Sequence, residues 1–161
     1  MNPVQLPHTG EVILRLAMAT LVGCIIGINR ELKGKPAGLR THALVTLGAA
    51  LMTLSMLHLS ADGNVIQTDA LSRVIQGIIT GIGFLGAGVI IREESGNVRG
   101  LTTAATVWIS AALGIVCGVG NWPAVITALG LVLLVLMLGG PIDQLLAKLQ
   151  AKSNSEHHHR K

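Results

Sequence analysis

RELKGKPAGLRTHALVTLGAAL, residues 30–51, returns in altered form as REESGNVRGLTTAATVWISAAL, residues 92–113. Aligned without gaps, the two stretches agree at eleven of 22 positions, whereas composition alone gives roughly one match in ten. Each begins with a charged, glycine-containing segment and runs into apolar sequence. We interpret them as an internal repeat in which each copy supplies the loop and second helix of a hairpin. The identities are Arg30/Arg92, Glu31/Glu93, Gly34/Gly96, Gly38/Gly100, Leu39/Leu101, Thr41/Thr103, Ala43/Ala105, Val45/Val107, Ala49/Ala111, Ala50/Ala112 and Leu51/Leu113.

The composition around this repeat is that of a membrane protein. Half of the 161 residues are hydrophobic and 12% are charged, whereas soluble domains are about a quarter charged. The apolar residues are mainly aliphatic, and there are 20 glycines, which membrane helices tolerate better than soluble ones. The net charge is +4, and most of the lysines and arginines lie between and after the apolar runs. It is therefore a topology signal, and no nucleic-acid partner is expected.

Five apolar segments are long enough to cross a bilayer as helices, which takes about 20 residues. We therefore predict an all-α, polytopic fold embedded in the lipid bilayer, with a transmembrane domain over residues 1–140. Leucines at 145, 146 and 149 lie opposite Lys148 and Lys152, which predicts a short amphipathic interfacial helix at 141–152. Residues 153–161 are expected to form a disordered polar tail. The five spans are roughly 12–28, 39–59, 71–91, 101–119 and 123–138.

The loop charges predict the orientation. Loops 29–38 and 92–100 and the C-terminal end carry Lys and Arg, whereas loop 60–70 carries two Asp and no cation. Because positive loops stay inside, the N-terminus is expected outside and the C-terminus inside. Both hairpins then run in the same direction, so the repeat is parallel, with a pseudo-twofold axis along the membrane normal. Arg30 and Arg92 are expected at the same depth on the inner side.

The outer ends of the hairpins also agree. Glu11 precedes Arg15 by four residues, and Asp69 precedes Arg73 by four. An acid at a helix start is favoured by the helix dipole, and a spacing of four allows an ion pair. The two pairs are therefore predicted, although arginines so near the interface could equally snorkel into the headgroups.

The third span holds five glycines between Gly77 and Gly88. Two interpretations fit. The small-xxx-small spacing of Gly77 and Gly81 predicts a close approach to a neighbouring helix. Alternatively, the helix is locally unwound and its backbone lines a site, as in broken transporter helices.

Charged and polar residues within the spans are functional candidates by default. Arg40 is expected to pair with Glu31 or Glu93 across the inner mouth. Either Thr102 or Thr103 is expected to cap the fourth span. None of the eight carboxylates lies near the middle of a span, so no buried Mg²⁺ site is predicted. No P-loop, HExxH or Ser/His/Asp arrangement is present, and we expect no enzyme activity, cofactor or metal.

The blocks RELKGKPAGLRTHALVTLGAA, SRVIQGIITGIGFLGAGVIIR and VRGLTTAATVWISAALGIVCGVG together resemble the MgtC/SapB family of bacterial inner-membrane proteins. The resemblance implies a five-helix membrane domain with a cytoplasmic C-terminus in the plasma membrane. It also implies roles in adaptation to low Mg²⁺ and in intracellular survival, without Mg²⁺ being carried. We expect this chain to lack the soluble ACT-like domain that can follow the fifth helix in this family.

The family motif maps onto both hairpins. Our main hypothesis is a non-enzymatic protein that modulates ion or proton homeostasis through membrane-protein partners, such as an ATP synthase or a transporter. The rival is a small homo-oligomeric channel or transporter with a glycine-rich pathway, and a homodimer is expected. A scaffold is the third hypothesis. Candidate functional residues are the polar members and span glycines of the motif, together with Asp69, Glu93 and Thr103. The motif residues are Arg30, Glu31, Gly38, Leu39, Arg40, Thr41, His42, Arg73, Gln76, Gly81, Gly83, Phe84, Gly86, Gly88, Arg99, Gly100, Leu101 and Thr102.

Overall fold

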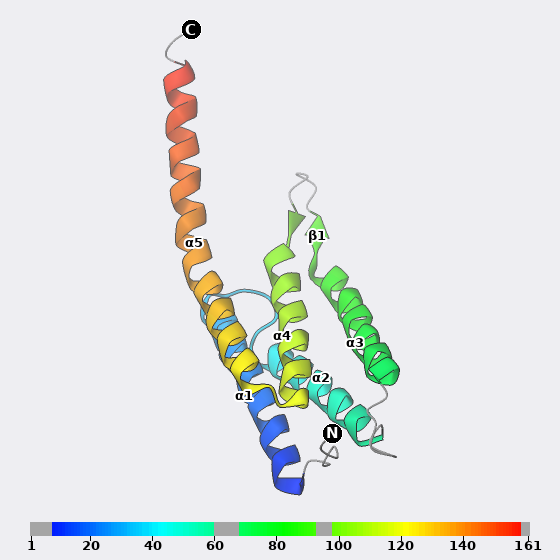
Figure 1. The fold of residues 1–161 in the computed structure, drawn as a ribbon. Coiled ribbons are helices and arrows are strands. Elements are labelled where there is room, and N and C mark those ends of the chain that lie inside the picture. The colour runs from blue at the N-terminus through cyan, green and yellow to red at the C-terminus, as the bar shows by residue number, and fades with distance from the viewer. Residues whose placement is uncertain (1–7, 60–67, 93–97, 159–161) are drawn as a thin grey trace. The chain divides into compact units, whose positions relative to one another are not determined.

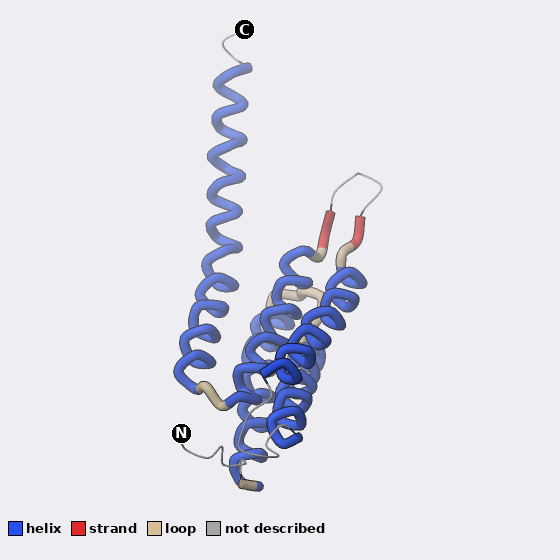
Figure 2. The backbone as a smooth tube through the Cα atoms, turned by 45° about the vertical axis from the view of Figure 1, so that its right-hand side comes forward, coloured by secondary structure: helices blue, strands red, loops and turns tan. Residues whose placement is uncertain are grey.

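The computed structural model describes residues 8–59, 68–92 and 98–158, and this part of the chain is almost entirely helical (Figures 1 and 2). Five helices are each long and apolar enough to cross a membrane, which confirms the predicted all-α architecture. The orientation and the repeat symmetry stay predictions. The elements are α1 (Thr9–Leu32), α2 (Leu39–Leu59), α3 (Thr68–Val89), β1 (Ile91–Arg92), β2 (Val98–Arg99), α4 (Leu101–Val119) and α5 (Trp122–His158).

The ends of the helices follow from residues that can leave helical geometry. Gly34, with φ of +60°, follows the last turn of α1, where the Lys33 and Gly34 amides donate to the Arg30 and Glu31 carbonyls. Gly100 and Gly120 flank α4 with φ of +91° and +85°. These values favour glycine because it has no Cβ. At Gly100 an added Cβ would also lie 2.9 Å from the carbonyl carbon of Val89.

A two-stranded antiparallel ladder joins α3 to α4, with Ile91 opposite Arg99 and Arg92 opposite Val98. This region was predicted only as a loop. The β-branched side chains of Ile91 and Val98 favour extended backbone, and a ladder satisfies backbone groups that a loop would leave to solvent. The signal is only two residues long on each side, which is too short for periodicity to detect.

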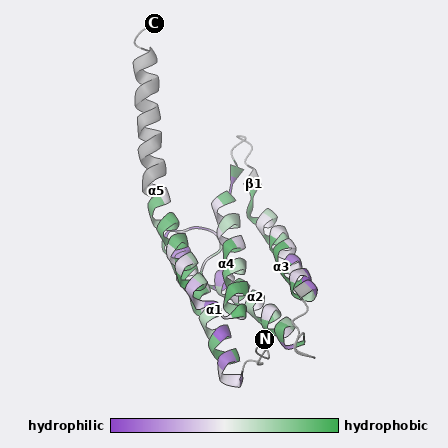
Figure 3. Ribbon diagram, viewed as in Figure 1, coloured by the Kyte–Doolittle hydropathy of each residue, from purple (hydrophilic) through white to green (hydrophobic). Residues whose placement is uncertain are grey.

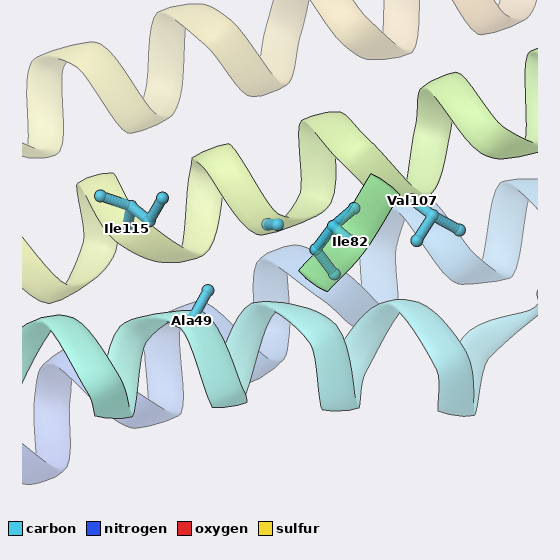
Figure 4. Packing of buried hydrophobic residues seen from close by; sticks show 5 residues of the cluster. Ala49, Ile82, Val107 and Ile115 are labelled. Carbon is cyan, nitrogen blue, oxygen red and sulfur yellow. The ribbon is translucent and has the colours of Figure 1, made fainter. Parts of the chain in front are cut away.

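Helix α2 lies between α1 and α4, and α3 packs against α4 and, over a smaller area, α2. Figure 4 shows the apolar cluster where α2, α3 and α4 meet, with labelled side chains from all three. The cluster relies on small and β-branched residues, which let the helix backbones approach. In the hydropathy view the more hydrophilic positions gather near the N-terminal ends of α1 and α3 (Figure 3). The buried cluster is Ala49, Ile82, Val107, Ala111 and Ile115.

Helix α5 runs as one helix through Pro141 to His158. It is therefore longer than the predicted span, and the segment predicted as a separate interfacial helix continues it. Its location at a membrane surface stays a prediction, and residues 159–161 lie outside the described residues. The chain divides into two compact units at Ile126, so the part of α5 beyond that residue is described by itself.

Candidate functional site

Among the residues whose burial is described, seven polar side chains are buried between the helices. We call six of them the polar cluster. The cluster joins the end of α1 to the first halves of α2 and α4. Burial of so many polar groups in an apolar bundle requires hydrogen-bond partners inside the protein. The polar cluster consists of Arg30, His42, Thr46, Thr103, Thr106 and Ser110, and the seventh residue, Thr53, lies further along α2.

Arg30 is the charged member of the polar cluster. It lies in the last turn of α1, is 4% exposed, and donates from Nη2 to Oγ1 of Thr103 over 2.6 Å. Its Nε is buried without an acceptor. No carboxylate among the described residues pairs with it. The bond connects two of the predicted candidate residues across 73 positions of sequence, and it ties the first hairpin to the second.

His42 is fully buried on α2. Its Nδ1 lies 2.9 Å from the Gly38 carbonyl, one turn earlier, so the neutral ring carries its proton on Nδ1 and leaves Nε2 as an acceptor. Nε2 is buried and has no partner. Arg30 and His42 thus each contain one buried polar atom without a partner, Nε and Nε2.

Most hydroxyl groups of the polar cluster donate hydrogen bonds to carbonyls of their own helices. Thr46 donates toward the His42 and Ala43 carbonyls, at 3.0 Å each. Thr106 and Ser110 donate to carbonyls three and four residues earlier, each over 2.8 Å. Such back-bonding satisfies the hydroxyl proton without a partner helix. Thr103 differs, because its oxygen accepts the Arg30 bond.

Glu31 has a different role from the one predicted. One carboxylate oxygen, Oε2, accepts the Leu39 amide proton over 3.0 Å, which caps the start of α2. No ion pair forms between Glu31 and Arg40 within the described structure, and Arg40 is exposed. That predicted pair is wrong because the carboxylate is already engaged with the backbone. The alternative partner, Glu93, lies outside the described residues.

The predicted caps of α4 are also wrong. Gly100 occupies the N-cap position and no side chain bonds to the first turn there. Thr103 is buried against Arg30 instead, while Thr102 is exposed. Both threonines lie inside the helix rather than before it, so their hydroxyls are too far along the chain to cap it.

Close helix contacts form at glycines other than the predicted pair. An added Cβ on Gly23 of α1 would lie 2.7 Å from the Ala43 Cα of α2, and one on Gly118 of α4 would lie 2.8 Å from the Ala50 carbonyl oxygen. A Cβ added to Gly77 or Gly81 would meet no other part of the described chain within 4 Å. The predicted approach on α3 is therefore wrong within the described chain. The alternative of an unwound helix is not seen either, since α3 is continuous.

The sequence did contain the signal for the true contacts. Gly23 and Gly27, and likewise Gly114 and Gly118, have the same small-xxx-small spacing. In each pair both glycines meet α2. The number of glycines favours α3 as the helix with close contacts, whereas their spacing indicates α1, α3 and α4 equally.

The candidate residues on α3 mostly face away from the bundle. Asp69, Arg73, Gln76 and three of the four candidate glycines are exposed. Among these glycines Gly86 alone is buried, and a Cβ added to it would lie 3.6 Å from the Ala104 Cβ. A shallow apolar groove of about 540 Å³ runs between α2 and α3. It is lined by Leu44, Val45, Gly48, Ala49, Met52, Val74, Gly77, Ile78, Gly81, Ile82 and Leu85.

The two predicted outer ion pairs have different outcomes. Arg15 pairs with Glu11 as predicted, and its Nη1 donates to the Gly118 carbonyl at the end of α4 over 2.8 Å. Asp69 and Arg73 do not pair within the described structure. Of the remaining candidates, Thr41 is exposed at the start of α2, and Arg99 is exposed on β2.

Two facts now define the class of protein: five helices able to span a membrane and a polar cluster enclosed by three of them. This is a multi-pass α-helical membrane protein. The chain belongs to the MgtC family, whose sequence pattern matches residues 16–145.

Three relatives illustrate the similarity. Protein SrpB of Synechococcus elongatus is 47% identical over 131 residues, covering 76% of this chain and 72% of the relative. Protein MgtC of Salmonella typhimurium is 47% identical over 116 residues, covering 72% of this chain and 47% of the relative. The putative magnesium transporter YhiD of Escherichia coli is 41% identical over 133 residues, covering 80% of this chain and 60% of the relative. The chain thus spans about half the length of MgtC. No solved structure matches the chain.

Proposed function

We propose that this protein is a non-enzymatic component of the bacterial plasma membrane that modulates ion or proton homeostasis by binding other membrane-embedded chains. One observation carries the proposal. A polar stripe of Arg73, Gln76 and Thr80 lies on the exposed side of α3. The spacings of three and four residues place the three side chains on one helical face.

This stripe is unusual for a membrane span. Polar side chains within spans ordinarily face the bundle interior or a partner, because apolar lipid offers them no hydrogen bonds. Arg73 is close enough to the start of α3 to snorkel, but Thr80 lies near the middle of the Asp69–Val89 span. The glycines on the same helix leave its surface open to a close neighbour. A second helix placed there would satisfy the polar groups and fill the open surface.

The charges beside the polar stripe are complementary to those of a second copy of this chain. Asp69 and Arg73 are both exposed and do not pair with each other, unlike Glu11 and Arg15. In a parallel twofold pair of α3 helices, each Asp69 can reach the Arg73 of the other copy, and each Gln76 can bond its counterpart. The homodimer then presents a larger membrane surface to further partners, such as an ATP synthase or a transporter.

The relatives support the link to ions. One of them carries the name putative magnesium transporter, which fits a role in adaptation to low Mg²⁺. A role in intracellular survival is part of the same proposal. The name also supports the second candidate, a homo-oligomeric channel or transporter. The open glycines Gly81, Gly83 and Gly88 favour that candidate, because two α3 helices meeting there would line any pathway with backbone.

Cysteine cross-linking in native membranes tests the homodimer. In a Cys24→Ser, Cys117→Ala background, Gln76→Cys is expected to form a disulfide-linked dimer on mild oxidation. Ile126→Cys is the matched control, since Ile126 is 69% exposed on another span. Equal cross-linking at both positions, or none at Gln76→Cys, would show that α3 is not the interface.

Flux measurement separates the two candidate functions. The purified chain is reconstituted into liposomes that contain a Mg²⁺ or pH indicator. A partner-dependent modulator gives no flux by itself. Flux that Gly83→Leu abolishes and Gly130→Leu preserves would establish the transporter instead. Gly130 is a suitable control because it is also a helical glycine with nothing within 4 Å.

A further inference from the structure

Arg30 is a buried cation that the described chain does not neutralise. It is 4% exposed, its Nη2 donates to an uncharged hydroxyl, and its Nε–H has no acceptor. The neighbouring carboxylate, Glu31, is turned toward the Leu39 amide. A buried charge without a counter-charge costs several kcal/mol, so this burial favours an anion that the described residues do not supply.

The start of α4 adds positive potential at the same place. Thr103, which holds Arg30, lies in the first turn of α4, and that turn contains no acidic residue and receives no side-chain cap. The first amides of a helix lack intrahelical acceptors, and the helix dipole makes this end favourable for anions. The start of α2 is different, because Glu31 serves it.

His42 does not add to this potential. Its buried Nε2 has no partner, but on the neutral ring this atom is an acceptor and offers no proton to an anion. The donors therefore come from Arg30 at the end of α1 and from the uncapped start of α4. We propose that Arg30, Thr103 and the first turn of α4 form a binding site for a tetrahedral oxyanion, the chemistry of a phosphate group.

Arginine suits this ligand, because its N–H groups match the oxygens of phosphate and the bonds are charge-assisted. The site lies at the end of α1 and the start of α4, and the ends of helices that span a bilayer reach the headgroup region. The oxyanion therefore comes either from free inorganic phosphate or from the phosphodiester of a lipid. This inference does not depend on the proposed function, since none of its residues belongs to the polar stripe of α3.

Thermal unfolding of the purified full chain in a phosphate-free detergent tests the site. Inorganic phosphate, compared with chloride at equal ionic strength, is expected to raise Tm by about 5 to 10 °C at roughly a hundred times its Kd. A saturable rise with phosphatidylglycerol in mixed micelles, and none with phosphate, assigns the lipid source. No rise with either probe overturns the proposal.

Two arginines offer a matched comparison. Arg15→Gln also removes a bond from α1 to α4, yet it leaves the polar cluster intact, so its Tm should be lower while its response to the oxyanion is unchanged. Arg30→Gln should lose the response. Thr103→Val, which keeps the side-chain volume, should raise the Kd for the oxyanion at least threefold. This variant tests the site if Arg30→Gln does not fold. Equal responses from wild type, Arg30→Gln and Thr103→Val would indicate a general salt effect and refute the site.

Discussion

The packing of α4 on α2 at Gly114 provides the sharpest test of the fold. An added Cβ at Gly114 would lie 2.9 Å from both the Cα of Thr46 and the Cβ of Ala49. Carbon atoms pack best at about 3.5 to 4.0 Å. Gly114→Ala must therefore move α4 away from α2 by a sizeable fraction of an ångström, because the opposing atoms belong to or adjoin the backbone and cannot rotate aside.

The magnitude follows from two opposing effects. Overpacking a tight contact costs about 1 to 3 kcal/mol, and a rigid backbone neighbour places this site at the upper end. Replacing glycine by alanine in a helix returns up to about 1 kcal/mol. The net loss in the free energy of unfolding is then about 2 kcal/mol, which corresponds to a fall in Tm of about 4 to 8 °C for a chain of this size.

Gly48→Ala is the matched control, because Gly48 lies on α2 itself and has nothing within 4 Å. It receives the same gain in helix propensity without the clash, so its Tm should stay level or rise. Both variants are measured by circular dichroism in one detergent. If Gly114→Ala unfolds with the wild-type Tm, or if Gly48→Ala loses as much, the close contact of α2 with α4 does not stabilise the bundle as argued.

Three further comparisons address the polar contacts, each read from Tm. Thr103→Val removes the hydrogen bond to a buried charge and should lower the free energy of unfolding by about 1.5 to 3 kcal/mol. Thr106→Val should lower it less, because the Thr106 hydroxyl bonds only to its own helix. Equal losses in the two variants would contradict the assigned role of Thr103. Arg15→Gln should lower Tm more than Glu11→Gln. It removes both the ion pair and the donor to the Gly118 carbonyl, whereas Glu11→Gln removes only an exposed ion pair, which contributes about 0 to 1 kcal/mol. The reverse order would show that the ion pair is the stabilising interaction. Glu31→Ala should cost about 1 kcal/mol by uncapping α2, and an unchanged Tm would refute the capping role.

The spans were predictable because a bilayer imposes a length and a composition that few other environments require. The contacts between them were less so. Glycine pairs four residues apart occur in α1, α3 and α4, but only those of α1 and α4 meet another helix in the described chain. Which face of a helix turns inward depends on all of its neighbours at once, and a local pattern does not contain that information.

The polar cluster shows the same contrast, because the sequence identified several of its residues but not the contacts between them. Arg30, His42 and Thr103 were identified as candidates from the repeat and the motif, and the structure brings them together. Their pairing was not predicted, because Thr103 was expected to act locally as a cap. The bond from Arg30 instead crosses between the hairpins. Residues matched by a repeat suggest equivalent roles within each hairpin, whereas this contact is made between nonequivalent positions of the two copies.

The same contacts explain why α3 differs from its neighbours. Arg15 holds the last turn of α4 and Arg30 holds its first turn, and in both helices the two contact residues are 15 positions apart, about 22 Å along an α-helix. The equal spacing fixes α1 and α4 antiparallel in one register, with α2 enclosed between their glycine pairs. Thr46 is approached from both sides, by Gly23 and by Gly114. Three helices are thereby fixed to one another, while Gly77, Gly81, Gly83 and Gly88 of α3 stay open. Neither arginine contact involves α3, so a displacement of α3 would leave both contacts in place.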